Sequence, residues 1–352
     1  MKNILMLHYD LHFYRIPIYN KLAEELKKDN INLIIWPEKI LNDIDKINFD
    51  YISDEFTFEK YKQILTEYKI ETIINFIQPR SPSFSFYLKV IFYTYLKKIN
   101  LLYYGHGLNL SSSSITLNFM YNFLHLFYKK IILYTPNEKK LLWPIHHKKI
   151  EIAYNTLDLS SRKSLITKTK NELREEYGLK DEFVVLFSGR IEKRKKLDIL
   201  LNIMKEKNGI KLIVVGPTKD KMYIDEMSKN ENIIYLGPVY DTKKMGEIFY
   251  ISDVFSIPGH IGLGLVEALY WGLPIVTLDV KHAPEIYYLK NEYNGFVLKN
   301  PNKLKEKLYE LSKNRIKLEK LSKNAEDTYK EKAEVSNMIK GFTDSIKEVT
   351  KC

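Results

Sequence analysis

Two cationic side chains follow an apolar run near the middle of the chain. Residues 183–187 (FVVLF) lead into Ser188 and Gly189, and Arg190 and Lys195 follow, five positions apart. An arginine fork and a lysine point charge suit a diphosphate, above all one that gains negative charge as it leaves. The alternative is a solvated basic run at the start of a helix. The apolar run and the glycine before Arg190 favour the diphosphate site.

A second candidate site lies in residues 256–277 (SIPGHIGLGLVEALYWGLPIVT). Gly262 and Gly264 open a predicted helix that carries Glu267 in its first turns and ends at Gly272. Bare glycine and the free N–H groups of a helix N-terminus favour a bound anion. A carboxylate beside a phosphate is unfavourable unless it accepts hydrogen bonds from hydroxyl groups, and ribose hydroxyls are the natural partners.

Two series of strands must position these residues. Apolar strands are predicted at residues 3–7, 31–36, 70–77, 101–104, 131–134 and 150–153, and then at 183–187, 210–215, 233–235, 254–257, 274–277 and 296–298. Strands that alternate with helices predict an α/β fold with parallel sheets, whose ligands bind outside the carboxyl ends of the strands. Residues 156–176 lose this alternation and become polar, so we place the linker there. Domains are expected at 1–160 and 161–334, followed by a lysine-rich helix.

The composition narrows the class of protein. The chain has 352 residues, a formal charge of +11 and one cysteine, Cys352, which excludes a disulfide framework and fits a reducing, cytoplasmic compartment. The charge indicates an anionic partner, and nucleic acid, anionic lipid and phosphorylated small molecules all fit it. The first residues, MKNILMLHYD, are too short in their apolar run for a signal peptide, and no membrane-spanning helix is expected. No H-E-x-x-H motif or carboxylate cluster indicates a metal.

Two aromatic stretches, residues 84–98 and 115–130, each have helical length and end in a lysine pair. One interpretation is a pair of buried helices that cover a sheet. The other is an aromatic and basic face that rests on an anionic membrane surface. Part of the aromatic area must cover the sheet, so we expect one exposed patch that binds the cytoplasmic leaflet reversibly.

The order of motifs resembles that of a known family. Gly-Arg-x4-Lys-x2-Asp at residues 189–198 is followed by Val-Val-Gly, Leu-Gly-x-Val, Glu-Ala-Leu-x2-Gly-x-Pro and Pro-Glu-Ile. This order is similar to glycosyltransferase family 4, firmly over residues 183–300 and more weakly through the N-terminal half. The resemblance implies the GT-B fold, with two Rossmann-like domains that face each other across a cleft. It also implies a retaining, hexosyltransferase-type enzyme without a metal cofactor, and a final helix, about residues 335–352, that packs back on the N-terminal domain.

The resemblance also implies roles for individual residues. His106 matches a histidine beside the donor sugar, Arg190 and Lys195 match the pair that holds the donor diphosphate, and these three are the expected catalytic residues. Glu267 matches the glutamate that binds ribose. The remaining expected contacts to the donor are Gly216, Val239, Gly259, His260, Gly262, Leu263 and Gly264.

Three places depart from the family pattern. In one of them His282 and Ala283 replace the usual glycines before Pro284 and Glu285, where backbone amides are still expected to face the sugar. Gly259 stands where the first glutamate of the E-x7-E motif would contact the donor sugar, with His260 next to it. Residues 8–15 (HYDLHFYR) have no glycine in place of the family's N-terminal glycine-rich loop. Arg15 or His12 is therefore expected to take over part of the role of that loop, on the donor-phosphate or acceptor side.

The sequence thus predicts a transferase that moves a sugar from a UDP- or GDP-sugar to a saccharide or lipid-linked acceptor in surface polysaccharide or glycolipid assembly. One alternative is a GT-B sugar-nucleotide epimerase. Another is a non-catalytic basic polymer-binding protein, but residues 190–196 lack the interleaved aromatic side chains that nucleic-acid binding needs. A dehydrogenase is disfavoured because no G-x-G-x-x-G follows the first strand.

Overall fold

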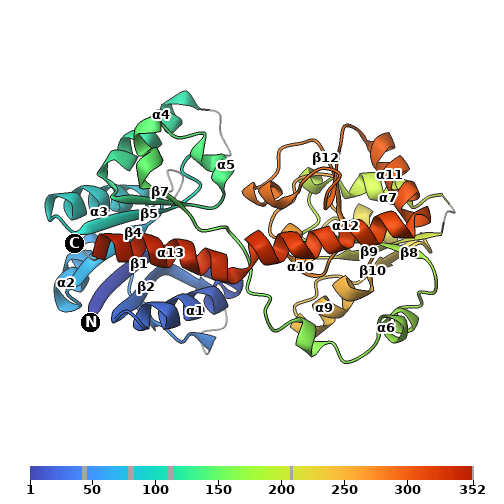
Figure 1. Cartoon of the computed structure of the whole chain (residues 1–352), viewed down its shortest axis with the longest axis horizontal. Helices are drawn as coiled ribbons and strands as arrows, with labels where there is room; N and C mark the ends of the chain where they lie inside the picture. Colours follow the sequence, from blue (N-terminus) through green and yellow to red (C-terminus); the bar gives the residue numbers. More distant parts are fainter. Residues whose placement is uncertain (42–45, 78–82, 110–113, 207–208, 351–352) are drawn as a thin grey trace. The chain divides into compact units, whose positions relative to one another are not determined.

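The computed structural model describes residues 1–41, 46–77, 83–109, 114–206 and 209–350. The chain divides into two compact domains, one formed by Met1–Asp158 with Glu334–Cys352 and the other by Leu159–Ala333. The sequence placed these boundaries at 160/161 and 334/335. Each domain is a sheet with helices on its faces (Figure 1). The predicted α/β class is confirmed.

The N-terminal domain is built on a parallel sheet of seven strands in the order β3-β2-β1-β4-β5-β6-β7. The strands are β1 (Lys2–His12), β2 (Ile31–Leu41), β3 (Asp50–Tyr51), β4 (Ile70–Asn75), β5 (Asn100–Gly105), β6 (Lys130–Leu133) and β7 (Ile150–Ile152). The chain reverses its direction of travel across the sheet between β1 and β4, which are paired neighbours. Ligands of such sheets bind outside the carboxyl ends of the strands at this switch point.

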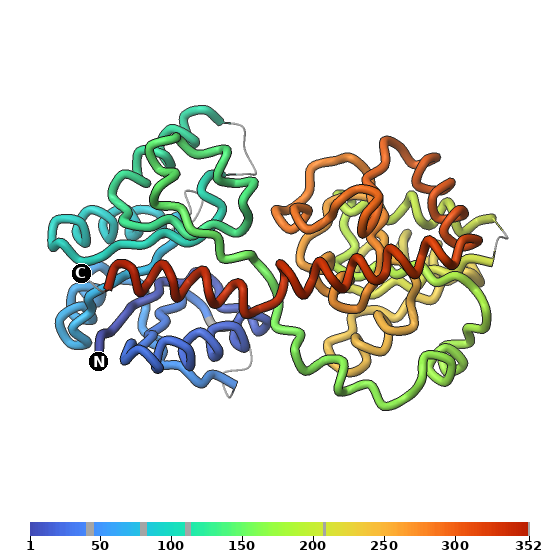
Figure 2. Tube along the Cα trace, in the orientation of Figure 1, coloured from blue at the N-terminus to red at the C-terminus, as the bar shows by residue number. Residues whose placement is uncertain are grey.

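Helices cover both faces of this sheet. They are α1 (Ile16–Lys27), α2 (Phe58–Glu67), α3 (Phe84–Leu96), α4 (Ile115–Leu124), α5 (Pro136–Lys139) and α13 (Val335–Thr350), with short helices η1 (Phe13–Arg15), η3 (His125–Phe127) and η4 (Pro144–Lys149). The final helix, α13, lies beside α1 in the tube view (Figure 2). Its Met338, Phe342 and Ile346 are fully buried in one core with side chains of β1 and α1. A second core lies under α2, α3 and α4.

The C-terminal domain repeats the same design. Its six parallel strands have the order β10-β9-β8-β11-β12-β13, so the switch point lies between β8 and β11. The strands are β8 (Phe183–Ser188), β9 (Ile210–Val215), β10 (Ile233–Tyr235), β11 (Val254–Ser256), β12 (Ile275–Leu278) and β13 (Gly295–Leu298). All six predicted strands of this half are present, because each is a short apolar run closed by a turn residue.

The helices of this domain are α6 (Lys170–Glu176), α7 (Leu197–Ile203), α8 (Lys221–Ser228), α9 (Thr242–Ile251), α10 (Gly264–Tyr270), α11 (Pro301–Lys313) and α12 (Arg315–Thr328), with short helices η5 (Lys163–Leu165), η6 (Lys193–Lys195), η7 (Pro284–Tyr288) and η8 (Tyr329–Ala333). Helix α10 begins at Gly264 and is followed by Gly272 at φ +69°, as predicted.

The boundary between the domains, after Asp158, lies within the expected linker, residues 156–176. The end of that segment was not expected to be helical, but it forms helix α6, which a capping box between Thr169 and Glu172 starts. Helix α4 ends at Leu124 and not near residue 130, because Lys130 already pairs with Leu102 as the first residue of β6. Within the part of the chain that the structure describes, no helix is long and apolar enough to cross a membrane.

Candidate active site

The loops at the switch point of the C-terminal sheet touch one another through glycines. Gly189 follows β8 and Gly216 follows β9, both at φ near +140°. A Cβ atom on Gly216 would lie 2.1 Å from the carbonyl oxygen of Gly189. Only glycine allows this close approach of two backbones, and it sets the path of the chain from β8 toward Arg190 and Lys195.

The next loop fastens Lys195 to the stretch after β11. The N–H of Gly259 donates to the carbonyl of Lys195 at 3.0 Å, and the N–H of His260 donates to the carbonyl of Arg194 at 2.8 Å. Nζ of Lys195 lies 3.4 Å from the carbonyl oxygen of His260. The two segments that the sequence singled out, residues 189–198 and 256–277, are therefore hydrogen-bonded neighbours.

This contact explains why glycine stands at position 259. A Cβ atom there would lie 2.1 Å from the Arg194 carbonyl oxygen and 2.8 Å from the Cα of Lys195. The glutamate that the family pattern places at this position does not fit without moving the loop that carries Lys195.

The two expected diphosphate ligands lie in different environments. Lys195 is partly buried, and burial, followed by the charge of Arg194, lowers its pKa to about 8. A desolvated ammonium group gains more from an anionic partner than an exposed one does. The side chain of Arg190 is 74% exposed, and its Nε lies 3.6 Å from Oε1 of Glu192. Glu192 also accepts from Nε of Arg194 at 2.6 Å, so its single carboxylate is shared by both arginines.

Unpaired backbone donors lie in the turn that leads into α10. The N–H groups of Gly262 and Leu263 have no hydrogen-bond partner among the described residues. A Cβ atom on Gly262 would meet nothing closer than Ala283 Cβ at 3.8 Å, so the backbone is open there. Gly264 instead packs closely, since its Cβ would lie 3.1 Å from the ring of Phe255. This turn can present free donors to an anionic ligand.

Two histidines, His260 and His282, make hydrogen bonds in and beside this turn. The N–H of Ile261 donates to Nδ1 of His282 at 3.3 Å, and Nε2 of His282 lies 2.9 Å from the carbonyl of Leu278. Nδ1 of His260 lies 3.0 Å from the carbonyl of Lys281. Burial lowers the pKa of both histidines, so both are neutral near pH 7. The role of His282 was not predicted.

Glu267, the expected ribose ligand, is buried in α10. Its Oε1 forms an ion pair with Nη1 of Arg162, which belongs to the polar segment before η5. Burial raises the pKa of Glu267, and the charge of Arg162 opposes that rise. Sequence reasoning missed Arg162, because nothing in the polar run around it marks it as a partner of residue 267.

Val239 lies in the loop after β10 and is partly buried, whereas Tyr240 next to it is 81% exposed. Gly216 lies nearer the switch point, where its N–H donates to the carbonyl of Gly237 at 2.9 Å. Gly216 is therefore hydrogen-bonded to Gly237, which lies two residues before Val239.

In the N-terminal domain, His106 follows β5 and pairs with a buried acid. Its Nδ1 lies 2.8 Å from Oε1 of Glu138. Oε2 of Glu138 accepts from the N–H of Thr135 at 2.8 Å as part of the capping box of α5. Nε2 of His106 has no partner among the described residues, and 39% of the side chain is exposed. Nδ1 of His106 thus fixes the orientation of the ring, and Nε2 is available to a ligand. The role of Glu138 was not predicted.

His12 and Arg15 lie at the carboxyl end of β1, beside the switch point of the N-terminal sheet. The ring of His12 stacks on Tyr14 at 5.2 Å. Arg15 is buried, and its Nη2 donates to Oδ1 of Asn155 at 2.7 Å. No carboxylate pairs with Arg15 in the described part of the chain. A buried guanidinium without an acid has unused capacity for an anion.

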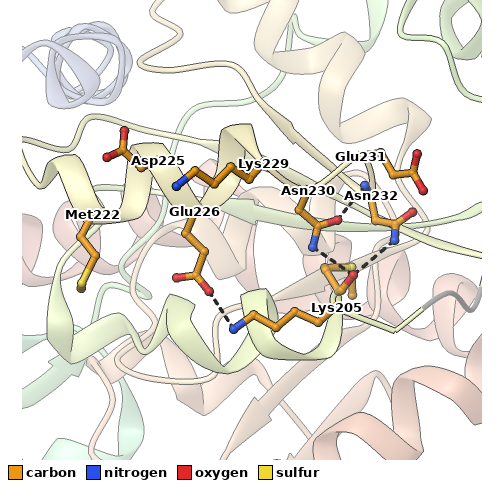
Figure 3. A pocket seen from close by; sticks show the side chains of 9 residues that line it. Lys205, Met222, Asp225, Glu226, Lys229, Asn230, Glu231 and Asn232 are labelled. Carbon is orange, nitrogen blue, oxygen red and sulfur yellow. Dashed lines mark hydrogen bonds and ion pairs between the residues drawn. The ribbon is translucent and has the colours of Figure 1, made fainter.

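The described residues contain no group of three or more His, Cys, Asp or Glu side chains that could hold a metal ion. A surface pocket of about 990 Å³ lies elsewhere, around α8 and the segment before β10 (Figure 3). In it Nζ of Lys205 pairs with Glu226 at 3.1 Å, and Asn230 and Asn232 both donate to the Met204 carbonyl. These residues precede β9 and β10, so the pocket lies at the amino ends of the strands, opposite the edge that carries Lys195.

Comparison with known proteins agrees with this geometry. Residues 169–328 match the family model described as glycosyl transferases group 1. An uncharacterized 41.2 kDa protein in the cps region of Klebsiella pneumoniae is 31% identical over 150 residues, 40% of each chain. The O-antigen biosynthesis glycosyltransferase WclY of Escherichia coli is 24% identical over 222 residues, 62% of this chain and 61% of that protein. The chain thus matches less than two thirds of the length of these curated relatives.

Solved structures resemble the whole fold. HepE of Anabaena in complex with UDP-glucose has a TM-score of 0.73 and 14% identity, over 99% of this chain and all of that one. A putative UDP-N-acetylglucosamine 2-epimerase from Listeria monocytogenes has a TM-score of 0.69 and 12% identity, over all of this chain and 97% of that one. The chain therefore has the GT-B fold, and residues 169–328 are similar to group 1 glycosyl transferases.

Proposed function

We propose that this protein is a retaining glycosyltransferase of the family 4 type. It transfers a sugar from a nucleoside diphosphate donor to a saccharide or lipid-linked acceptor in surface polysaccharide or glycolipid assembly. The observation that carries the proposal is the position of Lys195, a partly desolvated cation bonded through its loop to Gly259 and His260. Gly262 and Leu263, whose N–H groups have no partner among the described residues, come two and three residues after His260 in the sequence.

This arrangement suits a departing diphosphate. The bond between the anomeric carbon and the phosphate oxygen breaks, and the acceptor oxygen forms a bond to the same carbon on the same face. The proton of the acceptor hydroxyl passes to the departing phosphate oxygen. Lys195 and Arg190 stabilise the charge that develops on the diphosphate, which accelerates the reaction because that charge is larger in the transition state than in the bound donor. These cations supply the charge for which other transferases use a metal, so we expect turnover in EDTA.

His106 is the proposed contact to the transferred sugar. Its Nδ1 is occupied by Glu138, so Nε2 is the atom that can bond a sugar hydroxyl. Gly259 supplies no carboxylate to the sugar, and the neutral imidazole of His260 is the nearest side chain in sequence that could replace it.

The complex of HepE with UDP-glucose supports a UDP-sugar as donor. The match to group 1 glycosyltransferases over residues 169–328 favours a transferase over an epimerase, although the fold alone fits both. A thermal-shift screen with UDP, GDP and their sugars tests the donor class, since a ligand at about a hundredfold excess over Kd stabilises the native state by about 2.7 kcal/mol. Conversion of a UDP-sugar to its epimer without acceptor would establish the alternative.

We also propose that the acceptor is reached at an anionic membrane surface, on the cytoplasmic face. Residues 72–150 contain ten Lys and Arg residues and a single acid, the buried Glu138. The large apolar side chains exposed in this region lie on or near α3, α4 and η4: Phe92, Tyr95, Leu96, Ile115, Phe119, Phe123, Leu126, Leu141 and Ile145. We call this set the aromatic patch.

Ring contacts connect part of the aromatic patch. Phe127 lies 5.1 Å from both Phe92 and Tyr95, and 5.7 Å from Phe123, between ring centroids. A groove of about 500 Å³ adjoins them, and Lys98 and Lys129 are among the residues that line it. Exposed aromatic area next to lysines is typical of a surface that rests in a lipid interface.

A further inference from the structure

The ion pair between Arg162 and Glu267 joins the entry of the C-terminal domain to helix α10. The Arg162 side chain is 21% exposed and the Glu267 side chain 11%. Both charges are thus largely buried, and an unpaired carboxylate is costly when it is buried. Oε2 of Glu267 has no partner among the described residues, so one carboxylate oxygen is held and the other is free.

Neighbouring contacts fix the segment that carries Arg162. The N–H of Lys163 donates to the Tyr270 hydroxyl at 3.0 Å, and Nζ of Lys163 pairs with Glu326 at 2.8 Å. The same ammonium group lies 5.2 Å from the centre of the Tyr270 ring. Lys163 therefore holds the segment against α10 and α12, and the Arg162 side chain pairs with Glu267.

We propose that Arg162 is a positioning residue for nucleotide recognition, which holds the Glu267 carboxylate ionised and turned so that Oε2 accepts from the ribose of the donor. The inference rests on the proposed function, since it needs a nucleotide at the switch point. Glu267 lies five residues after Gly262 and four after Leu263, whose free N–H groups would face the phosphates. An ionised carboxylate only accepts hydrogen bonds, and a vicinal diol only needs acceptors for its two protons.

The pair gives the site a way to distinguish ribose from deoxyribose. A buried carboxylate fixed through one oxygen loses a hydrogen bond when the 2′-hydroxyl is absent and gains nothing in return. Sites built to bond a hydroxyl reject the analogue that lacks it much more strongly than apolar pockets reject a missing methylene. Without Arg162, the pKa of Glu267 would rise further, because burial raises it and the charge of Arg162 opposes that rise.

Calorimetric titration with UDP and with 2′-deoxy-UDP tests the inference in the full-length protein. The wild type should bind UDP about tenfold or more tightly than the deoxy analogue, as expected for a hydrogen bond to a charged group. Arg162→Ala should weaken UDP binding and reduce this ratio to about one, and Arg162→Lys should restore part of it. Lys163→Ala, which loosens the same segment without touching Glu267, should keep the wild-type ratio.

The outcomes separate this inference from the proposed function. If the wild type binds neither UDP nor any other nucleoside diphosphate, the proposed function fails. If the wild type prefers UDP and Arg162→Ala keeps that preference, only the role of Arg162 fails. Tighter binding of UDP by Arg162→Ala would also overturn it, because Arg162 would then block the ribose position. Should Arg162→Ala not fold, the comparison of Arg162→Lys with Glu267→Gln decides: the glutamine variant must lose the preference and the lysine variant must retain part of it.

Discussion

Nδ1 of His106 lies 2.8 Å from Oε1 of Glu138. This acid is buried, and its other oxygen accepts a hydrogen bond from the backbone N–H of Thr135. An ionised carboxylate accepts from Nδ1–H, which leaves the lone pair or proton of Nε2 as the reactive end of the ring. Two elements far apart in the sequence, the end of β5 and the start of α5, thus fix the tautomer and direction of one histidine.

Glu138→Gln should lower kcat by about tenfold to a hundredfold while leaving the affinity for UDP unchanged, because an orienting carboxylate acts on the histidine and not on the nucleotide. Steady-state kinetics and calorimetry measure the two quantities. Thr135→Ala is the matched control, since it changes the N-cap side chain of α5 and keeps both the acid and the backbone N–H that bonds it. Equal losses of kcat in both variants would mean that the acid only stabilises α5.

The pH dependence of turnover should report Lys195. Its folded-state pKa is lowered to about 8 by burial, so the charge is present below that pH and is lost as the pH rises through it. The value of kcat/KM for the donor should therefore fall above about pH 8, and the fall in kcat should begin at higher pH because a bound diphosphate stabilises the ammonium form. Lys195→Arg should remove the fall. A flat profile to pH 9 in the wild type would contradict the assignment.

Gly259→Ala should destabilise the loop that carries Lys195. The added methyl group would lie 2.1 Å from the Arg194 carbonyl, and overpacking of this kind costs about 1–3 kcal/mol. Thermal unfolding should show a lower Tm, with weaker UDP binding. Gly262→Ala, whose methyl meets nothing closer than 3.8 Å, should unfold at nearly the wild-type temperature. A Gly259→Ala variant with wild-type Tm and affinity would show that the loop moves at no cost.

Membrane association should depend on the aromatic patch and on salt. The protein should float with vesicles that contain anionic lipid and detach as salt rises, since each lysine near such a surface contributes about 1 kcal/mol and salt screens it. Leu96→Gln with Phe119→Gln should reduce flotation. Ile316→Gln, an 83% exposed residue of α12 in the other domain, is the control and should not. Protein that stays unbound at low salt with anionic vesicles would indicate a soluble acceptor.

Most of the fold could be predicted from the sequence because the strands are marked by local patterns of residues. Short apolar runs marked every strand of the C-terminal sheet, and Gly264 and Gly272 bracket α10 as expected. Strand ends were less predictable, since they depend on partners: β1 runs on to His12 because it pairs with β2 as far as Leu41. The two-residue strand β3 carries no periodic signal at all.

Site residues were predictable where they lie on motifs and not where they act through tertiary contacts. Lys195, Gly259 and Glu267 come from the motif order, and the hydrogen bond between the first two explains a departure from it. Arg162 and Glu138 were missed, because each is defined by one partner that is 105 or 32 residues away. No composition or spacing rule marks such a pair.

The most direct test of the proposed donor site is the pair of variants Arg190→Ala and Lys195→Ala, compared with Lys221→Ala in α8 as a control. Initial rates of sugar transfer from a UDP-sugar should fall by about a hundredfold or more in each of the first two variants, because each removes charge that stabilises the departing diphosphate. Calorimetry should show weaker UDP binding by Lys195→Ala, while Lys221→Ala matches the wild type. Unchanged rates in both variants, with the fold intact, would contradict a diphosphate site at the switch point of the C-terminal sheet.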